Sequence, residues 1–221
     1  MRYEAVIFDF DGTIADTAAG IFESVLYALD KMSLPEASPQ TLRRFIGPPL
    51  DYSFQTYIGL SARDAETAVR FYRENYSQGG KYKLKFYPGI PKLLLDLRAA
   101  GVQTCLASAK PDLFIQQILT HFSAQDWFDH ALGMPMAEQS ADKSGVIRDV
   151  IDQCTVTDRR RLLMVGDTKF DIRGAKTLGL ESIGVLYGYG TRAELVEEGA
   201  DYLADSAEEI GSILICGNAV K

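Results

Sequence analysis

Residues 6–13 read Val6-Ile7-Phe8-Asp9-Phe10-Asp11-Gly12-Thr13. The apolar run 6–8 predicts a short buried strand, and the acidic residues come at its carboxyl end. Asp9 and Asp11 are two residues apart, so in an extended segment their side chains point the same way. Gly12 allows the chain to turn at once and to present backbone N–H groups to an anion. This stretch therefore predicts a strand that leads into a loop suited to chemistry on an anion.

The chain beyond residue 87 alternates between strand and helix patterns. Strands are predicted at 102–107, 130–132, 162–165 and 182–186, and helices at 91–100, 111–122, 143–154 and 172–178. Repeated βαβ units of this kind indicate an α/β fold with a doubly wound, Rossmann-like parallel sheet covered by helices.

The stretch from about residue 15 to 82 carries little strand signal. Apolar residues at helical spacing predict a helix over 17–32, and the helical segments that follow are broken at Gly47-Pro48-Pro49 and at Gly59. Lys81, Lys83 and Lys85 alternate with apolar residues, which indicates a returning strand with one solvated face. We therefore predict a core domain of residues 1–15 and 83–221, with an inserted helical domain of residues 16–82.

Polar residues follow several predicted strands. In doubly wound sheets, ligands bind outside the carboxyl ends of the strands, so these residues are expected to meet at one edge. Several carboxylates packed together repel one another unless a cation lies among them. The residues expected at this edge are Asp9, Asp11, Ser108, Lys143, Asp167 and Asp171.

The spacing of these residues suggests a role for each. Asp167 and Asp171, four apart at a strand-to-helix junction, can complete an oxygen-rich site suited to Mg²⁺. Ser108 can donate a hydrogen bond to a phosphoryl oxygen, and Lys143 can neutralise its charge. Taken singly, each Asp is also a common turn former or helix cap, and Ser108 is also a potential N-cap for the helix entered at residue 111.

Two nearby features leave alternatives open. Lys110 is either a rival phosphate ligand or a solvated loop lysine. The segment Tyr187-Gly188-Tyr189-Gly190 follows a predicted strand on the same edge, and its glycines either line the site or serve only the turn.

Composition narrows the classes of partner. The formal charge is 23 minus 30, or −7, with no clustered basic run, which argues against a nucleic-acid polymer or an anionic membrane as partner. A small anionic substrate remains compatible, because one metal ion and two basic side chains set the local field. No apolar stretch approaches a membrane span and no secretory signal is visible, so we expect a cytoplasmic protein. Its three cysteines form no CxxC pair, and we expect free, reduced thiols.

The motifs together resemble the haloacid dehalogenase superfamily over nearly the whole chain. Residues 9–17, Asp-Phe-Asp-Gly-Thr-Ile-Ala-Asp-Thr, look like its first motif, and Ser108 within Leu-Ala-Ser-Ala-Lys-Pro resembles the second. Lys143 matches the third motif, and residues 166–171, Gly-Asp-Thr-Lys-Phe-Asp, match the fourth. The phosphoglycolate phosphatase and 5′-nucleotidase-like branches look most similar, and the segment Gly47-Pro48-Pro49-Leu50 in the inserted cap is shared with both groups.

This resemblance implies a Mg²⁺-dependent phosphatase that acts through an aspartyl phosphate. Asp9 would be the nucleophile and Asp11 the general acid and base. Ser108, Lys143 and the amides at Gly12 would hold the phosphate. The metal ligands would be Asp9, the carbonyl of Asp11, Asp167 and, directly or through water, Asp171. The implied partner is a small phosphate ester, and the chain is expected to be a monomer or a homodimer.

Other functions remain as alternatives. A phosphomutase or phosphotransferase of the same superfamily would pass the phosphoryl group to another acceptor instead of to water. Removal of halide does not need the acid Asp11, and cleavage of a phosphonate would need a cap amine for which no clear candidate is seen. A non-catalytic binding protein is the alternative of another class, although every expected catalytic residue is present. The sequence does not identify the physiological substrate.

Overall fold

The computed structural model describes residues 2–136 and 142–216. The chain separates into two units, Met1–Ala15 with Phe86–Lys221, and Asp16–Lys85. The chain returns from the smaller unit to the larger one between Lys85 and Phe86, whereas the predicted boundary lies between residues 82 and 83. The connecting segments are β2 (Ala15–Asp16) and β3 (Lys85–Phe86), which pair as a small two-stranded sheet.

The larger unit is built on a six-stranded sheet with the strand order β5-β4-β1-β6-β7-β8. Every neighbouring pair in it is parallel, so the predicted doubly wound α/β fold is confirmed. The short apolar run after Glu4 forms the central strand because both of its faces are buried. The strands are β1 (Ala5–Phe8), β4 (Gln103–Pro111), β5 (His130–Met134), β6 (Leu162–Gly166), β7 (Glu181–Val185) and β8 (Tyr202–Ala204).

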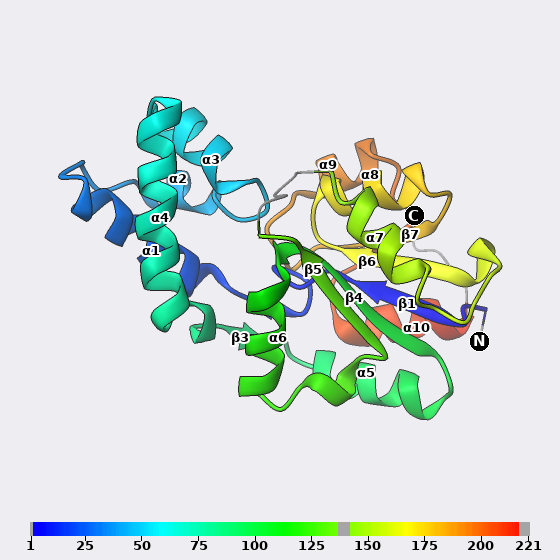
Figure 1. Ribbon diagram of the computed structural model, residues 1–221. Helices are drawn as coiled ribbons and strands as arrows, with labels where there is room; N and C mark the ends of the chain where they lie inside the picture. Colours follow the sequence, from blue (N-terminus) through cyan, green and yellow to red (C-terminus); the bar gives the residue numbers. More distant parts are fainter. Residues whose placement is uncertain (1, 137–141, 217–221) are drawn as a thin grey trace. The chain divides into compact units, whose positions relative to one another are not determined.

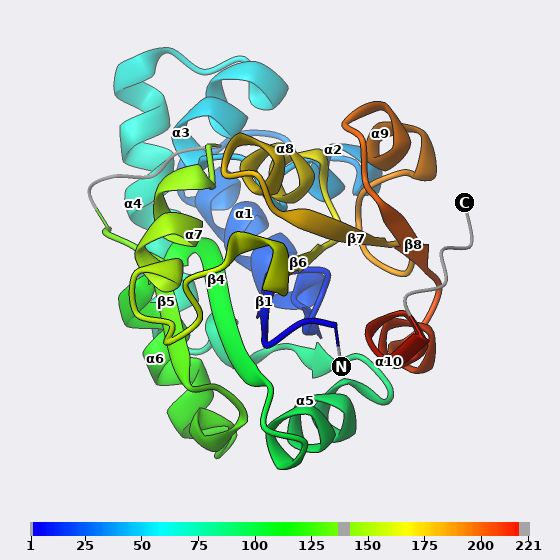
Figure 2. The same ribbon diagram turned by 90° about the vertical axis from the view of Figure 1, so that its right-hand side faces the viewer.

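Helices cover both faces of this sheet (Figures 1 and 2). One face carries α5 (Ile90–Ala99), α6 (Asp112–His121) and α10 (Ala207–Cys216), and the other carries α7 (Ser144–Ile151) and α8 (Lys169–Thr177), with α9 (Arg192–Glu197) beside α8. Ile7, Cys105 and Met164 pack with α7 and α8 in one buried cluster. Because side chains alternate along a strand, their neighbours Phe8 and Leu106 serve the opposite face.

Strand β4 differs from its predicted form. It continues through Ser108 to Pro111, because β5 continues to pair with it, with Gly133 opposite Ser108 and a shift of register before Pro111. Ser108 therefore lies inside the strand, and the N-cap of α6 is Pro111. The prediction contains none of the elements after β7, which are α9, β8 and α10. A three-residue strand such as β8 leaves little periodicity to detect.

The smaller unit consists of helices. They are α1 (Ala18–Lys31), α2 (Pro39–Arg43), α3 (Leu50–Ser53), a π-helical turn at Phe54–Ile58, α4 (Ala62–Gln78) and a 3₁₀ turn at Gly80–Tyr82. Helix α1 packs against α4, and a Cβ at Gly20 would lie 1.9 Å from the Gly80 carbonyl oxygen. The predicted strand over residues 81–86 is wrong at its start, because Lys81 is buried in the 3₁₀ turn and donates to the Ser77 carbonyl. Among the residues described, no helix has the length and apolar composition to cross a lipid bilayer.

Candidate active site

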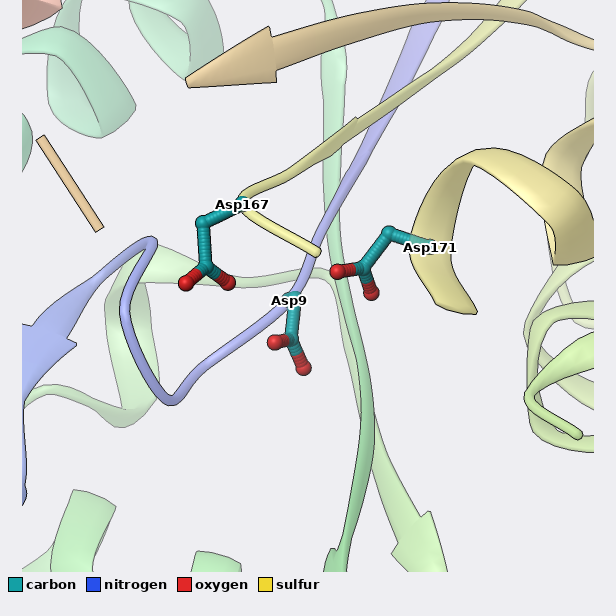
Figure 3. Close-up of side chains that lie close together, drawn as sticks. All are labelled: Asp9, Asp167 and Asp171. Carbon is teal, nitrogen blue, oxygen red and sulfur yellow. The ribbon is translucent and has the colours of Figure 1, made fainter. Parts of the chain in front are cut away.

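Three carboxylates meet at the carboxyl edge of the sheet in the larger unit. Asp9 follows β1, Asp167 follows β6, and Asp171 lies in the first turn of α8 (Figure 3). All three are buried, and one oxygen of each lies within 4.8 Å of one oxygen of the other two. Strands β1 and β6 are neighbours in the sheet, with Phe8 opposite Val165. The sheet therefore brings together the residue that follows each strand, Asp9 after β1 and Asp167 after β6.

Lys143 is the cation of this cluster. It is the N-cap residue of α7, and its Nζ lies 2.8 Å from Asp9 Oδ1 and 2.6 Å from Asp171 Oδ1. Burial alone lowers the pKa of Lys143, but Asp171 and Asp9 outweigh burial, so the pKa is raised and the ammonium stays charged. One ammonium against three carboxylates leaves the cluster with excess negative charge when all of them are ionised.

Burial and the neighbouring charges raise the pKa of two of these acids, Asp9 and Asp167. Burial, only partly opposed by Lys143, raises the pKa of the Asp9 carboxyl to about 7. Burial, together with the charges of Asp171 and Asp9, also raises the pKa of Asp167 well above its ordinary value. The carboxylates therefore favour the arrival of either protons or a cation.

The residues present fit a divalent metal ion. Asp9 Oδ1 is buried and faces the Lys143 ammonium at 2.8 Å, and a carboxylate oxygen that meets one donor still has a second lone pair for a metal ion. Oxygen ligands with excess negative charge suit a hard cation such as Mg²⁺. Asp9, Asp167 and Asp171 are the side chains that can hold it.

Asp171 is fixed by its own helix. Its Oδ2 accepts hydrogen bonds from the Thr168 N–H at 3.0 Å and from Thr168 Oγ1 at 2.7 Å. These bonds belong to a capping box at the start of α8, which satisfies donors that the first turn of a helix otherwise leaves free. The helix begins at Lys169, before the predicted start at 172, and this earlier start places Asp171 in the first turn.

Asp167 is held by the loop that follows β7. The N–H of Tyr189 donates to Asp167 Oδ2 at 2.7 Å. A Cβ added to Gly188 would lie 2.3 Å from Asp167 Cβ, and one added to Gly12 would lie 2.1 Å from Asp167 Oδ2. Gly12 also has a φ of +85°, a conformation that L side chains rarely adopt. The glycines of this loop therefore do more than form a turn, because they leave room for the carboxylate.

Asp11 lies apart from the three-carboxylate cluster. Its Oδ1 is 3.1 Å from Lys110 Nζ, and the two side chains are 15% and 6% exposed. Lys110 is therefore not a solvated loop lysine. Ser108 is also buried, and its Oγ accepts the Lys110 N–H at 3.2 Å. The sequence does not predict the pairing of Lys110 with Asp11. The one hint is that Lys110 lies two residues after Ser108, a predicted site residue.

Comparisons with known proteins agree with this architecture. A sequence profile for haloacid dehalogenase-like hydrolases matches residues 6–185. A protein of Pseudomonas aeruginosa named 5′-nucleotidase is 35% identical over 94% of this chain and 94% of that protein. Tyrosine-protein kinase PtkA of Mycobacterium tuberculosis is 32% identical over 95% of this chain and 71% of that protein. A Vibrio parahaemolyticus phosphoglycolate phosphatase is 26% identical over 93% of each chain.

A solved structure from Clostridium acetobutylicum, described as a predicted phosphatase, has the same fold. It superposes with a TM-score of 0.89 at 35% identity and covers 97% of this chain and 99% of that one.

Proposed function

Because the chain belongs to the haloacid dehalogenase-like hydrolase family, we propose that it hydrolyses small phosphate monoesters with Mg²⁺, through a phosphoryl group held on Asp9. The observation that carries this proposal is the position of Asp9. It is buried among Lys143, Asp167 and Asp171, and its Oδ1 lies 2.8 Å from the Lys143 ammonium.

Asp9 is the proposed nucleophile. One carboxylate oxygen attacks phosphorus in line with the ester oxygen, a P–O bond to Asp9 forms, and the P–O bond to the leaving alcohol breaks. Asp9, Asp167 and Asp171 would hold a Mg²⁺ ion, which when bound would supply electrostatic stabilisation and lower the raised pKa values of Asp9 and Asp167. This effect matters for Asp9, because its carboxylate must be ionised to attack phosphorus.

Lys143, Ser108 and the amides at Gly12 are the proposed phosphate ligands. Lys143 is supported by its place beside Asp9, because an ammonium 2.8 Å from the nucleophile is also near the phosphoryl oxygens. Ser108 Oγ accepts the Lys110 N–H, which leaves its own hydroxyl proton available to a phosphoryl oxygen.

Asp11 is the proposed acid and base. Its carboxyl gives a proton to the departing alkoxide and later takes one from the water that attacks phosphorus and releases Asp9. Lys110 holds one oxygen of this carboxylate. The carbonyl of Asp11 stays a proposed fourth protein ligand to the metal.

The proposed substrates are nucleoside 5′-monophosphates or phosphoglycolate. The choice is supported by the names of similar proteins and by the segment Gly47–Leu50 of the helical unit, which resembles both of these groups. Phosphate release from a panel of nucleoside monophosphates, phosphoglycolate and sugar phosphates ranks these classes directly.

A phosphotransferase is the second candidate, and the similarity to a tyrosine-protein kinase favours it. With p-nitrophenyl phosphate as donor, a hydrolase releases nitrophenol and inorganic phosphate in equal amounts. If a tyrosine peptide or a sugar alcohol is added and phosphate falls below nitrophenol, the phosphoryl group passes to that acceptor.

The nucleophile is tested with Asp9→Asn. The amide is nearly the same size but a poor nucleophile, so we expect kcat to fall by at least about 10³-fold with an unchanged circular dichroism spectrum. Chelation of divalent metal should abolish activity of the wild type. Near-wild-type turnover by Asp9→Asn would rule out the mechanism.

Asp11→Asn separates the two chemical steps. Nitrophenolate leaves without needing a proton, so this variant should release a burst of about one equivalent and then stall as the phosphorylated enzyme. Absence of both the burst and a covalent phosphate would mean that Asp11 does not have the assigned role.

A further inference from the structure

Two thiols from separate segments of the chain lie in contact outside the proposed active site. Cys105 Sγ on β4 and Cys154 Sγ are 3.5 Å apart, although the residues are 49 positions apart in sequence. Both are free cysteines; Cys105 is fully buried and Cys154 is half-buried. The sequence pattern predicted separate, reduced thiols, and their approach is a property of the tertiary structure.

Specific hydrogen bonds hold the two segments together. The side chain of Gln103, two residues before Cys105, accepts the Thr155 N–H at 2.9 Å and the Thr155 hydroxyl at 2.8 Å. Cys154 itself donates from Sγ to the Val150 carbonyl at 3.4 Å. The contact between the sulfur atoms is therefore built by an anchored turn and a central strand.

The two thiols differ in reactivity. Cys154 lies in a turn beyond the end of α7 between exposed neighbours, so a small oxidant reaches it before Cys105. The hydrogen bond between the two sulfurs lowers the pKa of Cys154 and raises that of Cys105. Exposure and thiolate character together select the cysteine that is oxidised first.

We propose that Cys105 and Cys154 are a redox-modification site that peroxide closes into a reversible intrachain disulfide. Cys154 attacks one peroxide oxygen, the O–O bond breaks, and sulfenic acid and water form. Cys105 then attacks the sulfenic sulfur, loses its proton, and a second water leaves as the S–S bond forms. The two thiols are oxidised by two electrons, and one peroxide is reduced to two waters.

The movement needed is small. A disulfide requires the sulfurs to approach from 3.5 Å to about 2.05 Å. The turn that carries Cys154 can supply this shift because it lies outside any helix or strand. The bond would join β4 to the segment after α7, and we expect it to raise the thermal midpoint because it constrains the unfolded chain. This proposal does not depend on the proposed phosphatase activity.

The experiment uses the full chain carrying Cys216→Ser, so that these two thiols alone remain. The reduced protein is treated with increasing hydrogen peroxide, blocked with iodoacetamide and measured by intact mass and peptide mapping. We expect a loss of about 2 Da, a cross-linked peptide joining Cys105 to Cys154, no alkylation of either thiol, and full reversal by dithiothreitol.

The matched control adds Cys154→Ser, a nearly isosteric change at the half-buried position. It should lose the cross-linked peptide and the rise in thermal midpoint while keeping the wild-type circular dichroism spectrum. Addition of oxygen without a cross-link in the Cys216→Ser protein, or a disulfide between two chains, would overturn the proposal.

Discussion

Asp167 is positioned by groups that carry no charge of their own. One oxygen accepts the Tyr189 N–H, and the backbone of Gly188 lies where any side chain would meet the carboxylate. An uncharged donor orients the carboxylate without neutralising it, so its negative charge stays available to a metal ion. The orientation of this proposed ligand therefore depends on a close approach of backbone.

Gly188→Ala tests this packing. Its Cβ would lie 2.3 Å from Asp167 Cβ, so the carboxylate or the loop must move. We expect weaker Mg²⁺ binding by calorimetry and a fall of about 10²-fold in phosphate release, because displacement of about 1 Å misaligns the site.

Gly145→Ala is the matched control, because its added Cβ meets nothing within 4 Å. It should keep activity within about twofold of the wild type, as surface changes usually do. Unchanged Mg²⁺ binding in Gly188→Ala would mean that the loop does not set the orientation of Asp167.

Among the helices and strands, most side chains of the proposed active site come from the ends of strands or from the first turns of helices. Asp9 and Asp167 follow strands, Lys143 is the N-cap of α7, and Asp171 is in the first turn of α8. Ser108 and Lys110 differ from these, since both remain within β4 near the shift of register. A parallel sheet brings these ends to one edge, so residues that are distant in sequence become neighbours.

The turn Gly47–Leu50 in the helical unit allows a prediction about substrate selection. Gly47 has a φ of +105° and Gly59 a φ of +84°, and an added Cβ at either position meets nothing within 4 Å. Gly47→Ala and Gly59→Ala should therefore lose a similar amount of stability, about 1 kcal/mol each, from backbone strain.

We expect selectivity to separate the two variants. The ratio of kcat/KM for a nucleoside monophosphate to that for phosphoglycolate should change in Gly47→Ala by about fivefold or more, equivalent to about 1 kcal/mol in the transition state. The same ratio should stay constant in Gly59→Ala. Equal ratios in both variants would show that the Gly47 turn has only a structural role.

For the whole molecule, the carboxylate cluster links stability to pH. The Asp9 pKa of about 7 lies above its ordinary value of 3.8, and that of Asp167 is raised as well. The folded protein therefore keeps protons that the unfolded chain has already lost. In chelator, stability should fall as the pH rises from about 4 to about 7, because the native state binds more protons there.

Thermal unfolding at pH 5 and pH 7.5, in chelator and in Mg²⁺, measures this effect. We expect the midpoint in chelator to be lower at pH 7.5, and Mg²⁺ to remove most of the difference by stabilising the ionised carboxylates. Asp167→Asn should reduce both the pH effect and the Mg²⁺ effect. If the thermal midpoint at pH 7.5 is the same in Mg²⁺ and in chelator, this cluster does not bind the metal.

Local signals in the sequence are enough to predict the parallel fold and the polar residues that gather at one edge of its sheet. Strands such as 6–8 are short apolar runs bounded by turn formers, and these signals are local, so the chemistry of Asp9 and Asp167 is visible from their neighbours.

The contacts between distant residues depend on the tertiary structure. The pairing of Lys110 with Asp11, the Tyr189 N–H on Asp167 and the contact of Cys105 with Cys154 each join separate segments of the chain. Such contacts depend on the register of neighbouring strands and on the packing of loops, and local sequence propensity predicts neither. The proposed roles of Asp9 and Asp11 thus begin in one short stretch of sequence, but the ionisation of Asp9 is set by burial and by the residues that the fold brings to it.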